Sequence, residues 1–73
     1  MSGFTVVRTP LILLGEMAAV LTGPDRFTSL MQELVGNPHV RVDIIQSVLS
    51  MHKVPQQDID RVVSQYQQAK AAS

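Results

Sequence analysis

Residues 24–36 read PDRFTSLMQELVG, and the spacing of the apolar residues in this stretch decides the class of fold. They recur at intervals of three and four, as Phe27, Leu30, Met31, Leu34 and Val35. At this spacing, side chains share one face of an α-helix and form a stripe that packs against other elements. We therefore predict an amphipathic helix here, with Gly36 as a left-handed C-terminal cap.

The four prolines of the chain each stand at the start of a segment with helical periodicity: Pro10, Pro24, Pro38 and Pro55. Proline is favoured at the first position of a helix, because its missing N–H has no partner there and its fixed φ suits the helix. The residue before a proline is held extended, as an N-cap is, and Thr9 and Asn37 are good N-cap residues. We therefore predict four helices that begin near residues 10, 24, 38 and 55.

The two later helices carry apolar stripes of the same kind. In the fourth helix, the stripe consists of Ile59, Val62, Val63, Tyr66 and Ala69. In the third helix, it consists of Ile44, Ile45, Val48, Leu49 and Met51. The start of the third helix has two interpretations: Pro38 opens it, or Asp43 caps a shorter helix that follows an extended run over residues 40–42.

The first helix differs from the others because its own apolar residues cover nearly its whole circumference. Between Leu11 and Leu21 the chain is apolar except at Gly15 and Glu16. A helix that is apolar on all sides needs cover on all sides, from its own domain or from a partner. The sequence leaves two interpretations, a central helix of a compact bundle or a helix with an exposed face that contacts another molecule.

These patterns predict an all-α fold, a compact bundle of three to four short helices with an extended N-terminal arm. The arm comprises residues 1–8, and residues 9–73 form a single small helical domain. The arm contains the β-favouring run FTVV at residues 4–7, which is too short to form a sheet alone. It either packs loosely on the bundle or adds to the sheet edge of a partner.

The charge and the lack of cysteine exclude several classes of function. Six basic and six acidic residues give this 73-residue chain a formal net charge of zero, which argues against nonspecific binding to nucleic acid or to anionic membranes. The lack of cysteine excludes disulfides, thiol catalysis and thiolate metal sites. The apolar stretch over residues 11–21 is about half as long as the roughly 20 residues of a membrane span, and no targeting signal is evident. We therefore expect a cytoplasmic protein without membrane association.

The sequence contains no catalytic or cofactor-binding motif, so we expect neither an enzyme nor a cofactor. A metal site would have to use His39 and Asp43, which share a helical face if the third helix begins at Pro38. Two ligands do not make a structural zinc site, so no metal is expected. Asp58 and Asp60 point to different sides of a helix and form no paired-carboxylate site.

Residues 44–63, IIQSVLSMHKVPQQDIDRVV, resemble a helix-turn-helix. A short helix, a tight turn at residues 52–54 with a buried valine, and a second helix that opens with polar residues fit this pattern. The resemblance implies a DNA-binding alternative, in which a dimer reads sequence through Gln56, Gln57 and Arg61. Two aspartates of the same helix would face phosphates and weigh against it.

In size, neutrality and helical character, the chain resembles the small bacteriophage-encoded regulators that bind bacterial RNA polymerase. This resemblance implies a protein-binding regulator or inhibitor of transcription with RNA polymerase as its partner, and no functional residues carry over from it. The candidate contact residues belong to the arm and to the exposed face of the fourth helix: Phe4, Val6, Val7, Arg8, Gln57, Arg61 and Gln65. A third interpretation is a self-assembling subunit or homodimer built on the apolar first helix.

Overall fold

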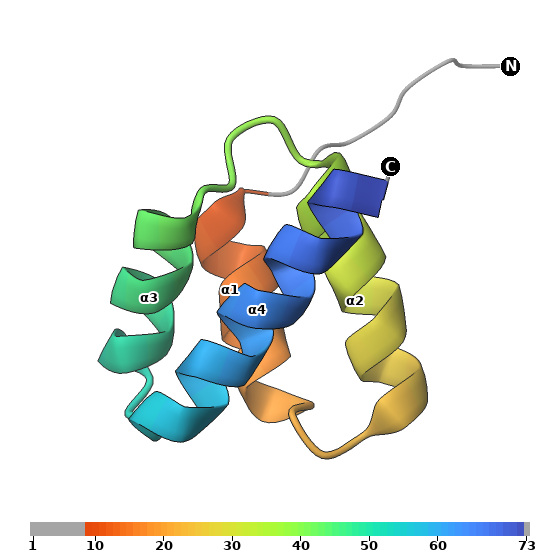
Figure 1. Cartoon of the computed structure of the whole chain (residues 1–73). Helices are drawn as coiled ribbons and strands as arrows, with labels where there is room; N and C mark the ends of the chain where they lie inside the picture. Colours follow the sequence, from red (N-terminus) through yellow and green to blue (C-terminus); the bar gives the residue numbers. More distant parts are fainter. Residues whose placement is uncertain (1–8, 73) are drawn as a thin grey trace, which may run out of the picture.

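The structure, a computed structural model, describes residues 9–72. These residues form four α-helices and no strands (Figure 1): α1 (Pro10–Ala19), α2 (Pro24–Gly36), α3 (Val42–Met51) and α4 (Gln56–Ala72). The predicted all-α class is therefore confirmed. The predicted arm, with its contact residues Phe4, Val6, Val7 and Arg8, lies outside the described residues.

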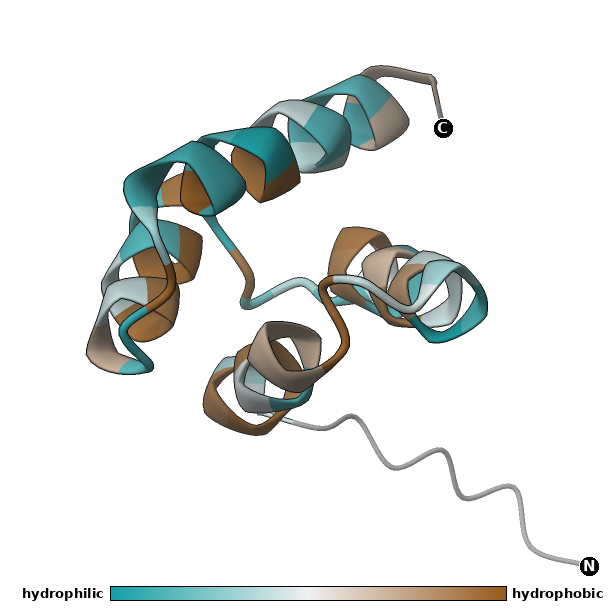
Figure 2. Cartoon of the chain, turned by 90° about the horizontal axis from the view of Figure 1, so that it is seen from below, coloured by the Kyte–Doolittle hydropathy of each residue, from teal (hydrophilic) through white to brown (hydrophobic). Residues whose placement is uncertain are grey.

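The four helices form a ring around one core. α1 packs against α2 and α3, and α4 packs against the same two helices. In the view of Figure 1, α1 and α3 run downwards while α2 and α4 run upwards, so the connection after α2 crosses the end of the bundle to reach α3. Seen from below, hydrophobic residues gather on the inner sides of α2, α3 and α4, whereas α1 is hydrophobic around most of its circumference (Figure 2).

The core is built from most of the residues of the three predicted stripes, from three residues of α1 and from one residue of the connection before α3. Burying a leucine-sized side chain contributes about 1.5–3 kcal/mol, so these residues dominate the stability of the fold. The buried apolar residues are Leu13, Leu14, Met17, Leu30, Met31, Leu34, Val40, Ile45, Val48, Leu49, Ile59, Val62 and Tyr66. The assignment of Met51 to the stripe of the third helix is wrong, because Met51 is the last residue of α3 and is 70% exposed.

The first two helices begin at the predicted prolines. The Thr9 hydroxyl oxygen accepts the N–H of Ile12 at 3.4 Å, so Thr9 is the N-cap of α1 and Pro10 is its first residue. Gly23 precedes α2 in extended conformation, and the helix begins at Pro24. In both cases the proline occupies the position where its missing N–H costs nothing.

The fourth helix begins at Gln56, one residue after the predicted proline. The Pro55 carbonyl accepts the N–H of Ile59 at 3.0 Å, which is the first bond of the helical ladder. Asp58 lies in the first turn, where the helix dipole favours a negative charge.

The predicted start of the third helix at Pro38 is wrong. α3 begins at Val42, and Arg41 precedes it in extended conformation, with φ −139° and ψ 163°. Of the two interpretations of the sequence, the shorter helix is therefore the one found. Its N-cap position is occupied by Arg41, and Asp43 lies inside its first turn instead of capping it.

Asn37 ends α2 and turns the chain before α3. Its side-chain oxygen accepts the N–H of His39 at 2.8 Å, and its carbonyl accepts the N–H of Val40 at 3.3 Å. Such local bonds compete with helix formation, which explains why no helix starts at Pro38. The predicted left-handed cap at Gly36 is also wrong, because the chain leaves α2 through an extended Asn37 whose side chain is buried.

A buried hydrogen bond fastens this turn to α4. The Tyr66 hydroxyl donates to the Val40 carbonyl at 2.9 Å, across 26 residues of sequence. Both residues are buried, so water cannot replace either the Tyr66 hydroxyl or the Val40 carbonyl as a hydrogen-bond partner. The bond holds the connection between α2 and α3 against α4.

We expect Tyr66→Phe to lower the free energy of unfolding by about 1–3 kcal/mol, because the Val40 carbonyl loses its buried partner while the ring stays in the core. Urea denaturation measures the change. Gln67→Ala, at the exposed neighbouring position of α4, is the control and should shift stability by no more than about 0.5 kcal/mol. Equal stability of Tyr66→Phe and the unaltered chain would contradict the importance of this bond.

Candidate functional site

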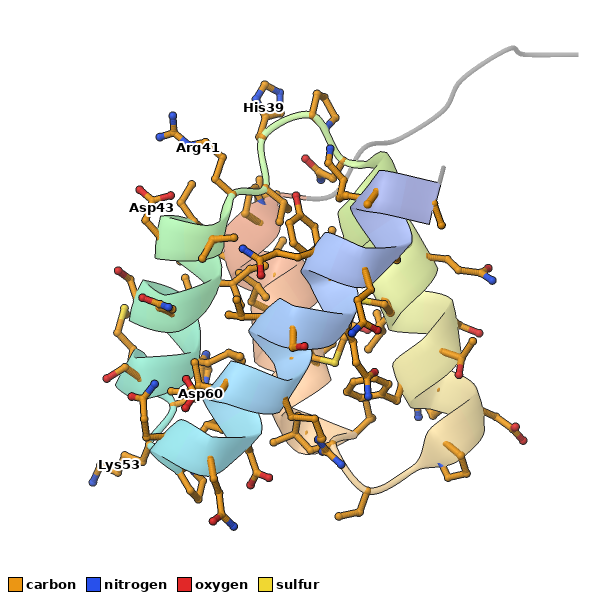
Figure 3. All side chains as sticks on the ribbon, in the orientation of Figure 1. His39, Arg41, Asp43, Lys53 and Asp60 are labelled. Carbon is orange, nitrogen blue, oxygen red and sulfur yellow. The ribbon has the colours of Figure 1, made fainter. Side chains whose placement is uncertain are left out.

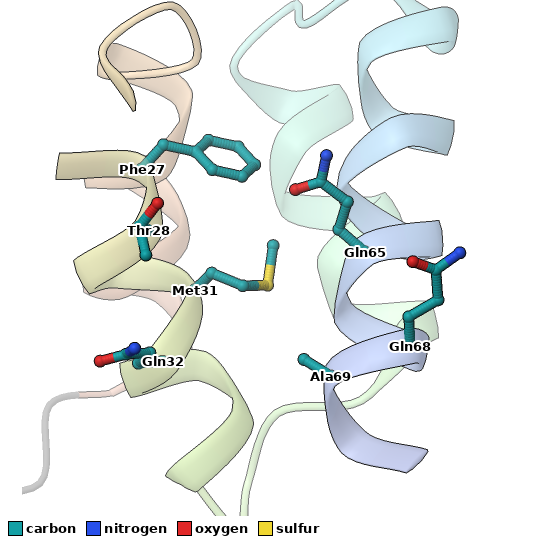
Figure 4. A pocket seen from close by; sticks show the side chains of 7 residues that line it. All are labelled: Phe27, Thr28, Met31, Gln32, Gln65, Gln68 and Ala69. Atoms are coloured by element: carbon teal, nitrogen blue, oxygen red, sulfur yellow. The ribbon is translucent and has the colours of Figure 1, made fainter. Parts of the chain in front are cut away.

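α2 and α4 leave a groove between them that the core does not fill (Figure 4). Phe27 and Met31 point into the groove from α2, while Gln65 and Ala69 line it from α4. The hollow measures about 540 Å³. It follows from the sequence of α4, because the last position of the apolar stripe is Ala69, which is too small to fill the space between the two helices.

The groove combines an apolar floor with an uncharged polar rim. On the floor, Met31 is buried and the Phe27 ring is half-buried. Amide and hydroxyl side chains both donate and accept hydrogen bonds, so this rim can bind peptide-like polar groups without a charged partner. The rim consists of four polar side chains from the two helices: Thr28, Gln32, Gln65 and Gln68.

Arg61 closes one end of the groove. A second hollow of about 590 Å³ continues the first one past Phe27 towards the connection between α1 and α2. There the Arg61 guanidinium donates to the Leu21 carbonyl at 3.1 Å and lies 5.6 Å from the centre of the Phe27 ring. A cation over an aromatic face is attracted to it, so Arg61 both positions the ring and ties α4 to the α1–α2 connection.

Two of the predicted contact residues, Arg61 and Gln65, line this groove. The third one on α4, Gln57, is exposed near the start of the helix and is not among the lining residues. The assignment of Phe27 and Met31 to the core stripe holds, since Met31 is buried and Phe27 packs against the core, but sequence reasoning missed that both also line a groove. Periodicity shows which face a residue occupies, but it does not show that two helices diverge.

The segment that resembles a helix-turn-helix folds as α3 and α4 joined by a tight turn over residues 52–55. The Val54 N–H bonds to the Leu49 carbonyl at 3.1 Å, and the Lys53 N–H bonds to the Ser50 carbonyl at 3.0 Å. This pair of bonds is a Schellman cap, which usually has glycine at the left-handed position. Here Lys53 takes that position with a φ of 61°, a conformation that costs a non-glycine residue about 1–2 kcal/mol.

We expect Lys53→Gly to raise the free energy of unfolding by about 0.5–1 kcal/mol relative to Lys53→Ala. Both substitutions remove the charge, but only glycine relieves the left-handed strain, and part of the gain is offset by the greater freedom of glycine in the unfolded chain. Urea denaturation of the two variants isolates the backbone effect. A glycine variant no more stable than the alanine variant would show that Lys53 is not strained.

The basic side chains in the described part of the chain are spread over the surface. Lys53 stands at one end of α3 and Arg41 at the other (Figure 3). On α4, the Gln56 side chain donates to the Asp60 carboxylate at 2.9 Å, so an acidic group lies where DNA phosphates would approach. Binding to a duplex depends on several cations on one face, and Arg41 and Lys53 lie at opposite ends of α3.

His39 and Asp43 do not share a helical face. His39 lies in the turn before α3, whereas Asp43 is in the first turn of the helix (Figure 3). The Asp43 carboxylate instead lies 3.7 Å from Arg41 Nε, in an exposed ion pair of little energetic weight. Among residues 9–72, no group of three or more acidic or histidine side chains is placed to hold a metal ion.

No protein-family model, curated protein or solved structure matches the chain. None of the helices in the described residues has the length and apolar character needed to cross a membrane. The surface chemistry of the bundle is therefore the basis for a functional hypothesis.

Proposed function

We propose that the protein is a small protein-binding regulator that holds an apolar segment of its partner in the α2–α4 groove. The groove supports this proposal because an aromatic ring and a methionine, Phe27 and Met31, lie at the floor of a hollow that is open to solvent. Aromatic and methionine side chains are enriched at protein interfaces, and aromatic anchors supply much of the binding free energy.

An amphipathic helix is the partner segment that fits best. α2 and α4 flank the groove on its two long sides, and such grooves accept the apolar face of a further helix (Figure 4). An apolar side chain of the segment rests on Phe27 and Met31, while its polar groups meet the amides of Gln65 and Gln68. Because the rim is uncharged, we expect the affinity to depend little on salt.

The process that we propose the protein regulates is transcription. The support for this is the small, neutral and helical character of the chain, which resembles bacteriophage-encoded regulators of bacterial RNA polymerase. Purified bacterial RNA polymerase is therefore the first partner to test, both for direct binding and for a change in transcript yield.

We expect a photo-reactive amino acid at position 65 to crosslink RNA polymerase, or another partner in the source cells, much more strongly than the same amino acid at position 57. Gln65 and Gln57 are both exposed on α4, but only Gln65 lines the groove. Ultraviolet crosslinking followed by mass spectrometry measures the two yields. Equal yields, or no crosslink at position 65, would contradict the proposal.

A substitution that fills the groove should prevent the partner from binding. Ala69→Phe places a ring in the hollow and is expected to abolish the crosslink at position 65. Ala72→Phe adds the same ring at an exposed position of α4 outside the groove and is the control. Circular dichroism of both variants shows whether the helices are intact.

The α3–α4 turn supports one alternative, a DNA-binding protein. Gln56 and Gln57 are exposed at the start of α4, directly after the turn, where a recognition helix presents its base-reading residues. Glutamine can read adenine in the major groove. The alternative therefore depends on whether this end of α4 binds a duplex.

We expect no measurable binding of duplex DNA at physiological salt, because the chain has a formal net charge of zero and Arg61 is engaged by the Leu21 carbonyl and the Phe27 ring. Fluorescence anisotropy of labelled duplexes, random and selected from a pool, at two salt concentrations tests this. Sequence-dependent binding that weakens with salt and is lost in Arg61→Ala would replace the groove proposal with DNA recognition.

A further inference from the structure

The groove between α2 and α4 carries a charge at one end only. On α4, its lining residues follow one another at i, i+4, i+7 and i+8, as Arg61, Gln65, Gln68 and Ala69, so they lie along one face of the helix. In the part of the chain that the structure describes, no carboxylate lines either of the two hollows, and Arg61 is their one charged lining residue. A segment bound in the groove therefore meets a cation at one end and uncharged groups elsewhere.

The Arg61 guanidinium is fixed in position and still has donors to offer. One of its terminal nitrogens donates to the Leu21 carbonyl at 3.1 Å, and the group lies 5.6 Å from the centre of the Phe27 ring. A guanidinium has five N–H donors in one plane, and a single hydrogen bond uses one of them. Because Arg61 is exposed and already held by two contacts, it can bind a further acceptor with little additional loss of side-chain entropy.

We propose that the partner segment carries a side-chain carboxylate, from aspartate or glutamate, which pairs with Arg61 while an apolar side chain of the same segment lies on Met31. This inference rests on the proposed function of the groove and names the chemistry of its partner. The two oxygens of a carboxylate match the planar guanidinium, which can bind them through two parallel N–H bonds. Arg61 then recognises one end of the segment, and Met31 recognises the other.

Desolvation favours a carboxylate over other groups at this end. A segment that covers the groove removes part of the water around Arg61, and a charge that loses water without gaining a partner destabilises the complex. An apolar group at this position leaves the guanidinium uncompensated, and a basic group is repelled by it. Since the end of the groove stays partly hydrated, the ion pair contributes more to the choice of partner than to affinity, and a single pair adds little salt dependence.

The spacing along α4 predicts the spacing within the partner segment. Arg61 and Ala69 are eight residues apart on α4, which corresponds to about 12 Å along the helix. The apolar anchor lies in the hollow over Met31 and Ala69, at the end away from Arg61. A helical segment that runs along the groove therefore places its carboxylate about two turns, or about seven to eight residues, from its apolar anchor.

Crosslinking locates this segment in the partner. The photo-reactive amino acid at position 65 labels one partner residue, which mass spectrometry identifies. Gln65 and Arg61 are one turn apart on α4, so we expect an aspartate or glutamate about one turn from the labelled residue, on the side away from the apolar anchor.

A reciprocal exchange of charges tests the pair. Arg61→Glu is expected to lower the crosslink yield at position 65 about tenfold, because two carboxylates then face each other. Replacing the partner's carboxylate residue by lysine is expected to restore most of the yield. A change in the partner cannot repair the lost contacts of Arg61 with the Leu21 carbonyl and the Phe27 ring, so restoration separates carboxylate recognition from a structural effect.

Arg41→Glu is the control, because Arg41 is exposed before α3 and lines neither hollow, and it should change the yield less than about twofold. With the unaltered chain, replacing the partner's carboxylate by its amide should lower the yield about threefold, a measurement that does not depend on the folding of any variant of the chain. No crosslink at position 65 would overturn both proposals. A crosslink that Arg61→Glu leaves unchanged, or that the exchange does not restore, would overturn only the pairing with Arg61.

Discussion

The hydrogen bond from the Tyr66 hydroxyl to the Val40 carbonyl secures the part of the chain on which the arrangement of helices depends. α2 and α3 follow each other in sequence but are diagonal in the bundle, so residues 37–41 have to cross the end of the core. A connection that crosses a core buries its backbone, and a buried carbonyl needs a partner. Tyr66 supplies that partner, so the connection before α3 is held against α4.

Small residues line two depressions on the surface of the bundle. Ala69 leaves the groove between α2 and α4, and Gly15 with Ala19 leaves the hollow on α1. In a domain of this size few side chains are available to cover apolar surface. A small residue near the rim of the core therefore opens a depression to solvent, where a larger protein would cover it with another element.

Much of the fold could be predicted from the sequence because helical periodicity and proline placement are local properties. Pro24 and Pro38 look alike in sequence, yet only Pro24 begins a helix, since the chain after Pro38 is held in a turn that Tyr66 fastens from far along the chain. The candidate site was predicted only in part. Arg61 was singled out for its polar, exposed position, whereas the role of Phe27 depends on the divergence of two helices, which is a tertiary property.

The ring arrangement also determines which contacts can form first during folding and which have to form later. α1 with α2, and α3 with α4, are pairs of consecutive helices that pack on each other across the short connections of residues 20–23 and 52–55. Such helical hairpins close small loops at low entropic cost. Docking of the two hairpins through α1–α3 and α2–α4 is then the non-local step, and a topology this rich in local packing is characteristic of domains that fold within microseconds to milliseconds.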